Sequence, residues 1–202
     1  MTGKTHAGIG AAVGIALAGK LPGGFNAVGM GLIIAASILP DIDHPKGMLN
    51  QYILPIKSKF IKTLFYGSFG ALVVFGNYYR FHIFMLYILG ALLFLIAISS
   101  HRNGLMHSAA GMIVCTVLVG YVANRYNIHV IIYYFMAGYG LHLLCDMSTS
   151  RGIPLLYPFK KKNYKFSYTF RVGSAKGTFI ENFLIILSLL YIIYRLPVVF
   201  KT

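Results

Sequence analysis

Seven apolar runs occupy most of this chain and restrict it to a helical fold. A segment that crosses a lipid bilayer must satisfy its backbone hydrogen bonds internally, which an α-helix of about 20 residues does. The runs are separated by short polar segments and cover residues 7–21, 27–39, 63–76, 81–99, 108–123, 128–147 and 179–200. The sequence therefore predicts an all-α, polytopic membrane protein, a helical bundle of about seven segments that forms one integral membrane domain over residues 1–202.

The composition supports a membrane location and excludes a soluble globular protein. Apolar residues make up 57% of the 202 residues and charged residues only 11%, whereas about a quarter of a soluble chain is charged. The mean hydropathy of +0.71 agrees with this interpretation. Cys115 and Cys145 both lie inside apolar runs, which favours two small buried side chains over a disulfide framework.

The start of the chain admits two alternatives to a full span. The first two runs are short and glycine-rich, and Leu21-Pro22-Gly23-Gly24 joins them, so they can form a helical hairpin that only partly crosses the membrane. The run at 63–76 is also short. If it does not cross the membrane, the predicted orientation of every later segment is reversed. Lys4 and the first run resemble a signal peptide ending at Ala16-Leu17-Ala18, but His6 belongs to the ligand set described below, so we expect the segment to be retained.

The basic residues predict the orientation in the membrane. When the 18 Lys and Arg residues are assigned to alternate faces, most fall on one face, at Lys4, residues 46–62, Arg102 and residues 151–176. The positive-inside rule then places the amino terminus in the cytoplasm and the carboxyl terminus outside. Orientation alone accounts for the net charge of +14, so no nucleic-acid partner is expected.

Residues 148–178 form the longest polar stretch and are predicted to be a cytoplasmic basic and aromatic interfacial loop. Within it, aromatic or aliphatic side chains alternate with polar ones at Tyr164, Phe166, Tyr168, Phe170 and Val172. This period of two predicts a strand on the membrane surface, with aromatic side chains toward membrane lipids and lysines toward headgroups. An irregular loop is the alternative.

Histidines and acidic residues gather at one end of the predicted segments. All four acidic residues and most of the seven histidines fall on the cytoplasmic side, whereas simple loop solvation would place such residues on both faces. His82 and His129 lie on the opposite face, where an interfacial polar role suffices. The cytoplasmic set comprises His6, Asp41, Asp43, His44, His101, His107, His142, Asp146 and Glu181.

The spacing of this set is typical of metal ligands. His142 and Asp146 are four residues apart and share one helix face, Asp41 and Asp43 lie in a turn before Pro45, and His101 and His107 flank a glycine-containing turn. Taken singly, each pair is also compatible with a hydrogen-bonded pair or ordinary turn chemistry. Glu181 is a further candidate ligand. Alternatively, its carboxylate interacts favourably with the dipole of the helix that it begins.

Mixed histidine and carboxylate ligands suit zinc best, with Mn²⁺ or Fe²⁺ as alternatives. Eight or nine ligands exceed one tetrahedral site, so two or three divalent ions are expected. Clusters of this kind hydrolyse phosphoesters. We expect Asp41 or Asp43 to act as the general base and Arg102 to steady the phosphate charge.

The chain resembles the YdjM-like family in the order and spacing of four motifs. That family is described as LexA-binding, inner-membrane-associated metal-dependent hydrolases. The matching pieces are Thr5-His6, the segment from Leu39 to His44, the block from His101 to Ser108, and the segment from His142 through Asp146 to Phe159. The resemblance implies similarity to zinc-dependent phospholipase C and metal-ligand roles for His6, Asp41, Asp43, His44, His101, His107, His142 and Asp146. The chain departs from the pattern at Asn103, where glycine is expected after His-Arg.

The sequence thus favours a membrane-embedded metal-dependent hydrolase that cleaves a phosphoester in a phospholipid or another lipid-linked substrate. A metal-ion transporter would need polar residues through the membrane, and the apolar runs contain few of them. A non-catalytic regulatory protein is suggested only by the LexA-binding part of the family description.

Overall fold

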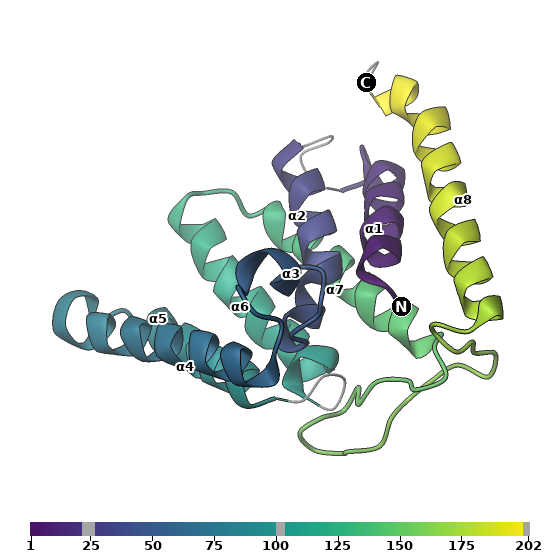
Figure 1. Ribbon diagram of the computed structural model, residues 1–202. Coiled ribbons are helices and arrows are strands. Elements are labelled where there is room, and N and C mark those ends of the chain that lie inside the picture. Colours follow the sequence, from purple (N-terminus) through teal and green to yellow (C-terminus); the bar gives the residue numbers. More distant parts are fainter. Residues whose placement is uncertain (22–26, 100–103, 200–202) are drawn as a thin grey trace.

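A computed structural model describes residues 1–21, 27–99 and 104–199 (Figure 1). These residues form helices and no strand, which confirms the all-α prediction. The α-helices are α1 (Gly3–Leu17), α2 (Ala27–Ile38), α3 (Asn50–Ile53), α4 (Lys59–Gly76), α5 (Phe84–Ile98), α6 (Ala109–Arg125), α7 (Ile131–Met147) and α8 (Ala175–Val199). Three short helical turns, η1 (Leu39–Asp43), η2 (Asn77–Phe81) and η3 (Leu105–His107), connect some of them.

The helices form a central group with one flanking element on each side. In the central group α2 packs against α1 and α7, and α6 packs against α7. Helix α8 lies along α1 on one side, while α4 and α5 pair as a hairpin that projects from the other side (Figure 1). The apolar core between α2, α5, α6 and α7 includes Ala36, Leu92, Ile96, Phe135 and Tyr139.

Glycines allow the central helices to approach one another closely. A Cβ atom at Gly138 of α7 would lie 2.3 Å from the carbonyl oxygen of Ile33 in α2, and one at Gly10 of α1 would lie 2.6 Å from Ser37 Oγ. Small residues at such crossings are typical of helix pairs in membrane proteins. The close contacts bring the ends of α1, α2 and α7 to one place.

Each of the seven apolar runs contains a helix, but the seven predicted spans are not confirmed. Within the described residues, two helical stretches, Lys59–Phe81 and Ala175–Pro197, are long and apolar enough to cross a membrane by length and composition; α5 and α6 are apolar but shorter. The α4–α5 hairpin runs across the direction of α8 in Figure 1. The predicted hairpin of the first two runs corresponds to α1 packed on α2, and its joining Pro22, Gly23 and Gly24 lie outside the described residues.

The predicted strand at 164–172 was wrong. The segment is an irregular loop with two isolated bridges, Thr149 to Phe170 and Ile153 to Tyr164. The Phe166 N–H donates to the Met147 carbonyl at the end of α7, so the loop is tied to the helix that it leaves. An alternating pattern needs a neighbouring strand to become a ladder, and the described residues supply none.

Candidate metal centre

The turn η1 follows α2 directly and carries Asp41 and Asp43. Asn50 holds this turn, because its side-chain amide donates hydrogen bonds to the carbonyl oxygens of Ile42 and His44, both at 2.8 Å. The Tyr66 hydroxyl donates in turn to Asn50 Oδ1 at 2.6 Å. The backbone of the aspartate turn is therefore fixed by side chains from α3 and α4.

Lys62 of α4 is a further support of the same turn. Its side chain is buried, with 1% of its surface exposed. The ammonium donates to the carbonyl oxygens of Asp43 at 3.1 Å, Ile96 at 2.8 Å and Ser99 at 2.7 Å. Lys62 thus joins the aspartate turn to the end of α5, whereas the sequence indicated only a charge that sets membrane orientation.

His142 is oriented by a backbone hydrogen bond. Its Nδ1 lies 2.7 Å from the carbonyl oxygen of Ser37, so Nδ1 carries the proton and donates it. The lone pair of Nε2 is then directed the other way, toward His107 Nε2 at 3.4 Å. A histidine that donates its second nitrogen to a carbonyl is typical of a metal ligand.

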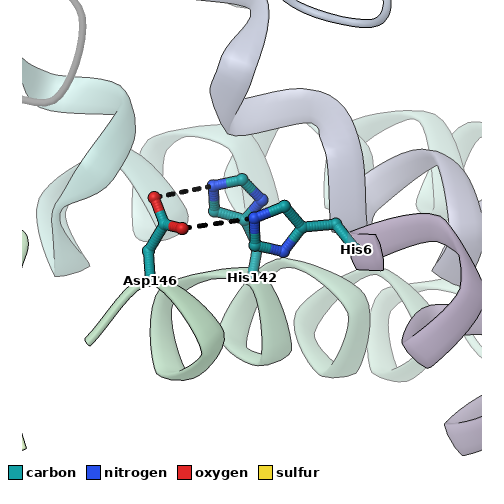
Figure 2. A group of neighbouring side chains, drawn as sticks. All are labelled: His6, His142 and Asp146. Atoms are coloured by element: carbon teal, nitrogen blue, oxygen red, sulfur yellow. Dashed lines mark ion pairs between the residues drawn. The ribbon is translucent and has the colours of Figure 1, made fainter. Parts of the chain in front are cut away.

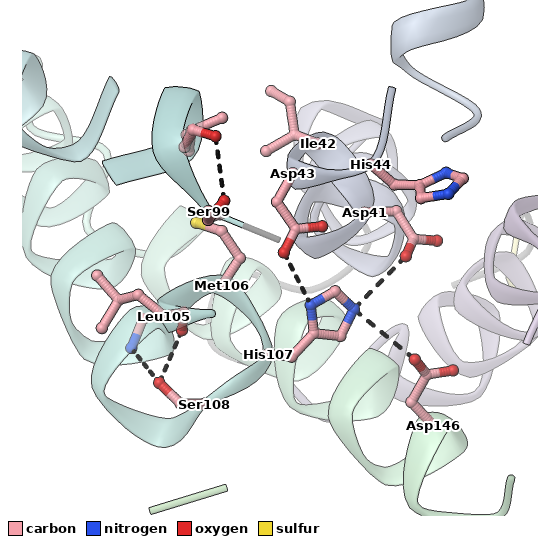
Figure 3. A network of polar contacts seen from close by, with 12 residues as sticks. Asp41, Ile42, Asp43, His44, Ser99, Leu105, Met106, His107, Ser108 and Asp146 are labelled. Atoms are coloured by element: carbon pink, nitrogen blue, oxygen red, sulfur yellow. Dashed lines mark hydrogen bonds and ion pairs between the residues drawn. The ribbon is translucent and has the colours of Figure 1, made fainter. Parts of the chain in front are cut away.

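His107 lies at the middle of the cluster (Figure 3). Its Nε2 is 3.5 Å from Asp41 Oδ1 and 3.7 Å from Asp146 Oδ2, while its Nδ1 is 3.4 Å from Asp43 Oδ2. One nitrogen therefore faces Asp41, Asp146 and His142, and the other faces Asp43. Asp43 itself is fully buried.

Two groups of three candidate ligands share His142. Asp41, His107 and His142 form one group, and His6, His142 and Asp146 form the other; within each group the donor atoms lie within 4.8 Å of one another. The closest separations are 3.4 Å between the Nε2 atoms of His107 and His142 and 3.5 Å between His107 Nε2 and Asp41 Oδ1. Ligands around tetrahedral zinc, with bonds of 2.0–2.1 Å, lie about 3.3–3.4 Å apart. The donor types and spacing therefore fit a small divalent cation.

His6 brings α1 to the same centre (Figure 2). Its Nε2 lies 3.2 Å from Asp146 Oδ1, and its ring stacks on that of His142 with centroids 3.9 Å apart. The amino group of Met1 also donates to Asp146 Oδ1. Among the described residues, His6 Nδ1 has no hydrogen-bond partner. Asp146 thus presents one oxygen to His107 and His142 and the other to His6.

Comparison with known families agrees with the motifs. The family model for the YdjM inner membrane protein matches residues 1–199. The chain belongs to the YdjM family. No curated protein and no solved structure matches it. Membership places this YdjM protein among inner-membrane proteins, and it confirms the resemblance that the motifs indicated.

The electrostatics of the YdjM centre are set by acids facing buried histidines. Burial alone would lower the pKa of His107, but the contacts with Asp41 and Asp43 outweigh it and raise the pKa to about 9. Burial would raise the pKa of Asp41, yet His107 and the other histidines hold it below its usual value. A cation, either a proton or a metal ion, is therefore strongly favoured between these groups.

The other predicted site residues have different surroundings. His44 is half-buried beside Asp41, and its ring lies outside the His107 contacts (Figure 3). Glu181 lies in the second turn of α8, where it accepts a hydrogen bond from the Thr2 N–H at 2.9 Å. His101 and Arg102 lie outside the described residues.

A cavity of about 650 Å³ adjoins the centre. It lies between the start of α1, the segment after η1 and the start of α8, and Asp41 forms part of its wall. His44 and Glu181 also line it. The cluster is thus reached through Asp41, while His107, His142 and Asp146 are fully buried behind it.

Proposed function

We propose that this YdjM-family protein is a membrane-embedded, metal-dependent hydrolase that cleaves a phosphoester of a lipid or lipid-linked substrate. The observation that carries the proposal is a pair of buried candidate ligand groups beside a cavity: Asp41, His107 and His142 form one, and His6, His142 and Asp146 form the other. Buried carboxylates are costly unless they are paired or bind metal, and a purely structural cluster has no need of an adjoining cavity.

Asp41, His107 and His142 would hold one ion. His6 and Asp146 would contribute to another, since His6 Nε2 lies 3.2 Å from Asp146 Oδ1. Zinc is the ion that this donor set favours, with Mn²⁺ or Fe²⁺ as alternatives, and two or three ions are proposed. When bound, such ions supply Lewis acidity toward a phosphate and lower the pKa of water.

The aspartates take different roles in this proposal. Asp43 faces His107 Nδ1 and so keeps Nε2 directed toward the metal position, which makes Asp43 a positioning residue. Asp41 lines the cavity, and its carboxylate oxygen that is not engaged as a ligand is proposed to accept a proton from water held against a substrate. Arg102, identified from the sequence alone, is proposed to steady the charge of the substrate phosphate.

The test is metal analysis of the purified protein combined with a phosphate-release screen over phospholipids and prenyl phosphates. We expect at least one equivalent of zinc, which His142→Ala abolishes together with phosphate release. His129→Ala is the matched control, since His129 is exposed and outside the cluster. Less than one equivalent of metal in the wild type, or full activity in His142→Ala, would contradict the proposal.

A second variant separates positioning from ligation. Asp43→Asn should keep the metal stoichiometry at saturating zinc but weaken zinc affinity on the order of 10–100-fold. Asp146→Asn should instead reduce the stoichiometry itself, because Asp146 is one of the three candidate ligands in the group with His6 and His142. Metal uptake into proteoliposomes without phosphate release would favour transport.

A further inference from the structure

The cavity beside the centre contains two lysines that the metal chemistry does not use. Lys4 lies in the first turn of α1, and Lys46 lies in the segment after η1; both line the cavity together with Asp41. Both side chains are exposed, so each can turn its ammonium toward a ligand in the cavity. Lysine ammonium groups bind phosphate as point charges.

Polar groups of α8 line the same cavity. Thr178 and Asn182 can each donate a hydrogen bond into it. Glu181 lies beside them and its carboxylate repels an anion, so a bound phosphate is favoured near the lysines rather than against Glu181. The charged part of a ligand is thereby oriented toward the metal centre.

Part of the remaining wall is apolar and continues along α8. Met48, Val172 and Ile185 line the cavity, and Ile185 is one helical turn beyond Glu181. Past Ile185, α8 exposes large apolar side chains such as Leu189 and Ile193, and it is one of the two stretches long and apolar enough to cross a membrane. The cavity thus passes from cationic groups to the surface of a candidate membrane helix.

We propose that this cavity binds a phosphate-bearing lipid. Lys4 and Lys46 contact the phosphate next to Asp41, and the acyl portion lies along Met48 and Ile185 toward α8. The volume of about 650 Å³ is within the range of about 300–1,000 Å³ that small-molecule sites occupy, and it exceeds the needs of a bare phosphate. The assignment of this lipid as substrate rests on the proposed hydrolase function, whereas the binding itself does not.

Binding is tested on the full chain in detergent, by calorimetry with dihexanoyl phosphatidic acid as the probe, with and without zinc. The double variant Lys4→Ala/Lys46→Ala should bind the probe at least tenfold more weakly, because each lost charge-assisted contact is worth on the order of tenfold. The control is Lys57→Ala/Lys59→Ala, which removes two exposed lysines of the neighbouring segment. Equal binding by the lysine variant and its control would overturn the proposal.

A second pair of variants distinguishes a lipid from a soluble phosphoester. Ile185→Asn should weaken binding of phosphatidic acid severalfold and leave glycerol 3-phosphate unaffected, whereas Ile186→Asn, at an exposed neighbour, should alter neither. If glycerol 3-phosphate binds as tightly as phosphatidic acid and Ile185→Asn changes neither affinity, the ligand is soluble and the lipid assignment fails.

The two proposals fail in different ways. If the protein binds phosphatidic acid through the lysines but never releases phosphate, the lipid-binding proposal holds and the hydrolase proposal is contradicted. If phosphate release depends on His142 but its KM is unchanged in Lys4→Ala/Lys46→Ala, the hydrolase proposal holds and the lipid-binding proposal is contradicted.

Discussion

At the scale of single residues, His107 has the most informative surroundings. Three carboxylates, from Asp41, Asp43 and Asp146, lie within 3.7 Å of its two ring nitrogens. These contacts overcome the effect of burial and raise the pKa of His107 to about 9 in the metal-free protein. A proton therefore occupies the centre at neutral pH when no metal is bound, and metal must displace it.

Zinc affinity should consequently rise with pH by up to tenfold per unit and level off above about pH 9, where His107 is already deprotonated. Competition against a chelator between pH 6.5 and 9.5 measures this dependence. Asp43→Asn removes one of the charges that raise the pKa, so its plateau should begin at lower pH. Affinity that is flat from pH 7 to 9 would contradict the assignment of His107.

The same proton affects the stability of the metal-free protein in a defined direction. Because the folded pKa of about 9 exceeds the ordinary value of 6.5, the contribution of protonated His107 is complete below about pH 6.5. It is lost progressively as pH rises through about 9. The metal-free protein is thus expected to unfold more readily above pH 9, in the range where zinc binds best.

The gathering of His6, Asp41, His107, His142 and Asp146 could be predicted because all of them lie at helix ends on one predicted face. Their individual roles as ligands stay predictions. The position of Asp43 behind His107 could not be predicted, since spacing of two residues does not say which carboxylate points where. Lys62 was missed because a lysine near a helix start is normally a surface charge, and its burial depends on carbonyl groups distant in sequence.

At the scale of helices, the contact of α7 with α2 positions His142. Gly138 is one turn before His142 on the same face of α7, and a Cβ atom there would lie 2.3 Å from the Ile33 carbonyl oxygen. Helix α2 also carries the Ser37 carbonyl that accepts from His142. The separation of these two helices therefore sets the direction of the imidazole.

Gly138→Ala should separate α7 from α2, lower the free energy of unfolding by about 1–3 kcal/mol through overpacking, and weaken metal binding. Gly140→Ala is the matched control in the same helix, since the nearest atom to its added Cβ is Met112 Sδ at 3.9 Å. Alanine is the better helix former, so this control should unfold no more easily than the wild type. Equal stability and metal content of the two variants would contradict the account.

The α4–α5 hairpin is coupled to the centre through Lys62. Lys62→Met removes the donor shared by the carbonyl oxygens of Asp43, Ile96 and Ser99. The Ile96 carbonyl keeps a hydrogen bond from Ser99 Oγ, whereas an unsatisfied buried acceptor costs about 1–3 kcal/mol. We expect the variant to be destabilised by several kcal/mol in denaturant unfolding and to bind metal more weakly. Lys59→Met, at an exposed position one turn earlier, should change neither quantity. A variant at Lys62 that unfolds like the one at Lys59 would show that the three contacts are dispensable.

Helices were the part of the fold that the apolar runs predicted well, because a run of ten or more apolar residues favours a helix. The strand at 164–172 failed because alternation reports which side chains share a face and does not report whether a neighbouring strand exists. All five of its alternating side chains are exposed or half-buried in a loop, with Tyr168 at 94% exposure. Its position against a lipid surface stays a prediction.

At the scale of the whole molecule, the family and the inner-membrane location follow from the sequence, but the number of spans does not. Hydropathy counts apolar residues and cannot distinguish a lipid-facing helix from one buried in its own protein. Helix α7 illustrates the difficulty: it has 17 residues, and Tyr134, Phe135 and Tyr139 on it are buried by neighbouring helices. Whether α7 crosses the membrane decides the side on which the basic loop lies.

Cysteine labelling in membrane vesicles tests this crossing directly. Lys161 follows α7 and Arg125 precedes it, both are exposed, and the positive-inside rule places them on opposite sides of the membrane. In a chain whose Cys115 and Cys145 are replaced by Ala, Lys161→Cys should react with an impermeant maleimide only in inside-out vesicles. Arg125→Cys should react only in right-side-out vesicles. If both react from one side, α7 does not cross, and the candidate centre and its cavity belong to a bundle anchored by fewer than the seven predicted spans.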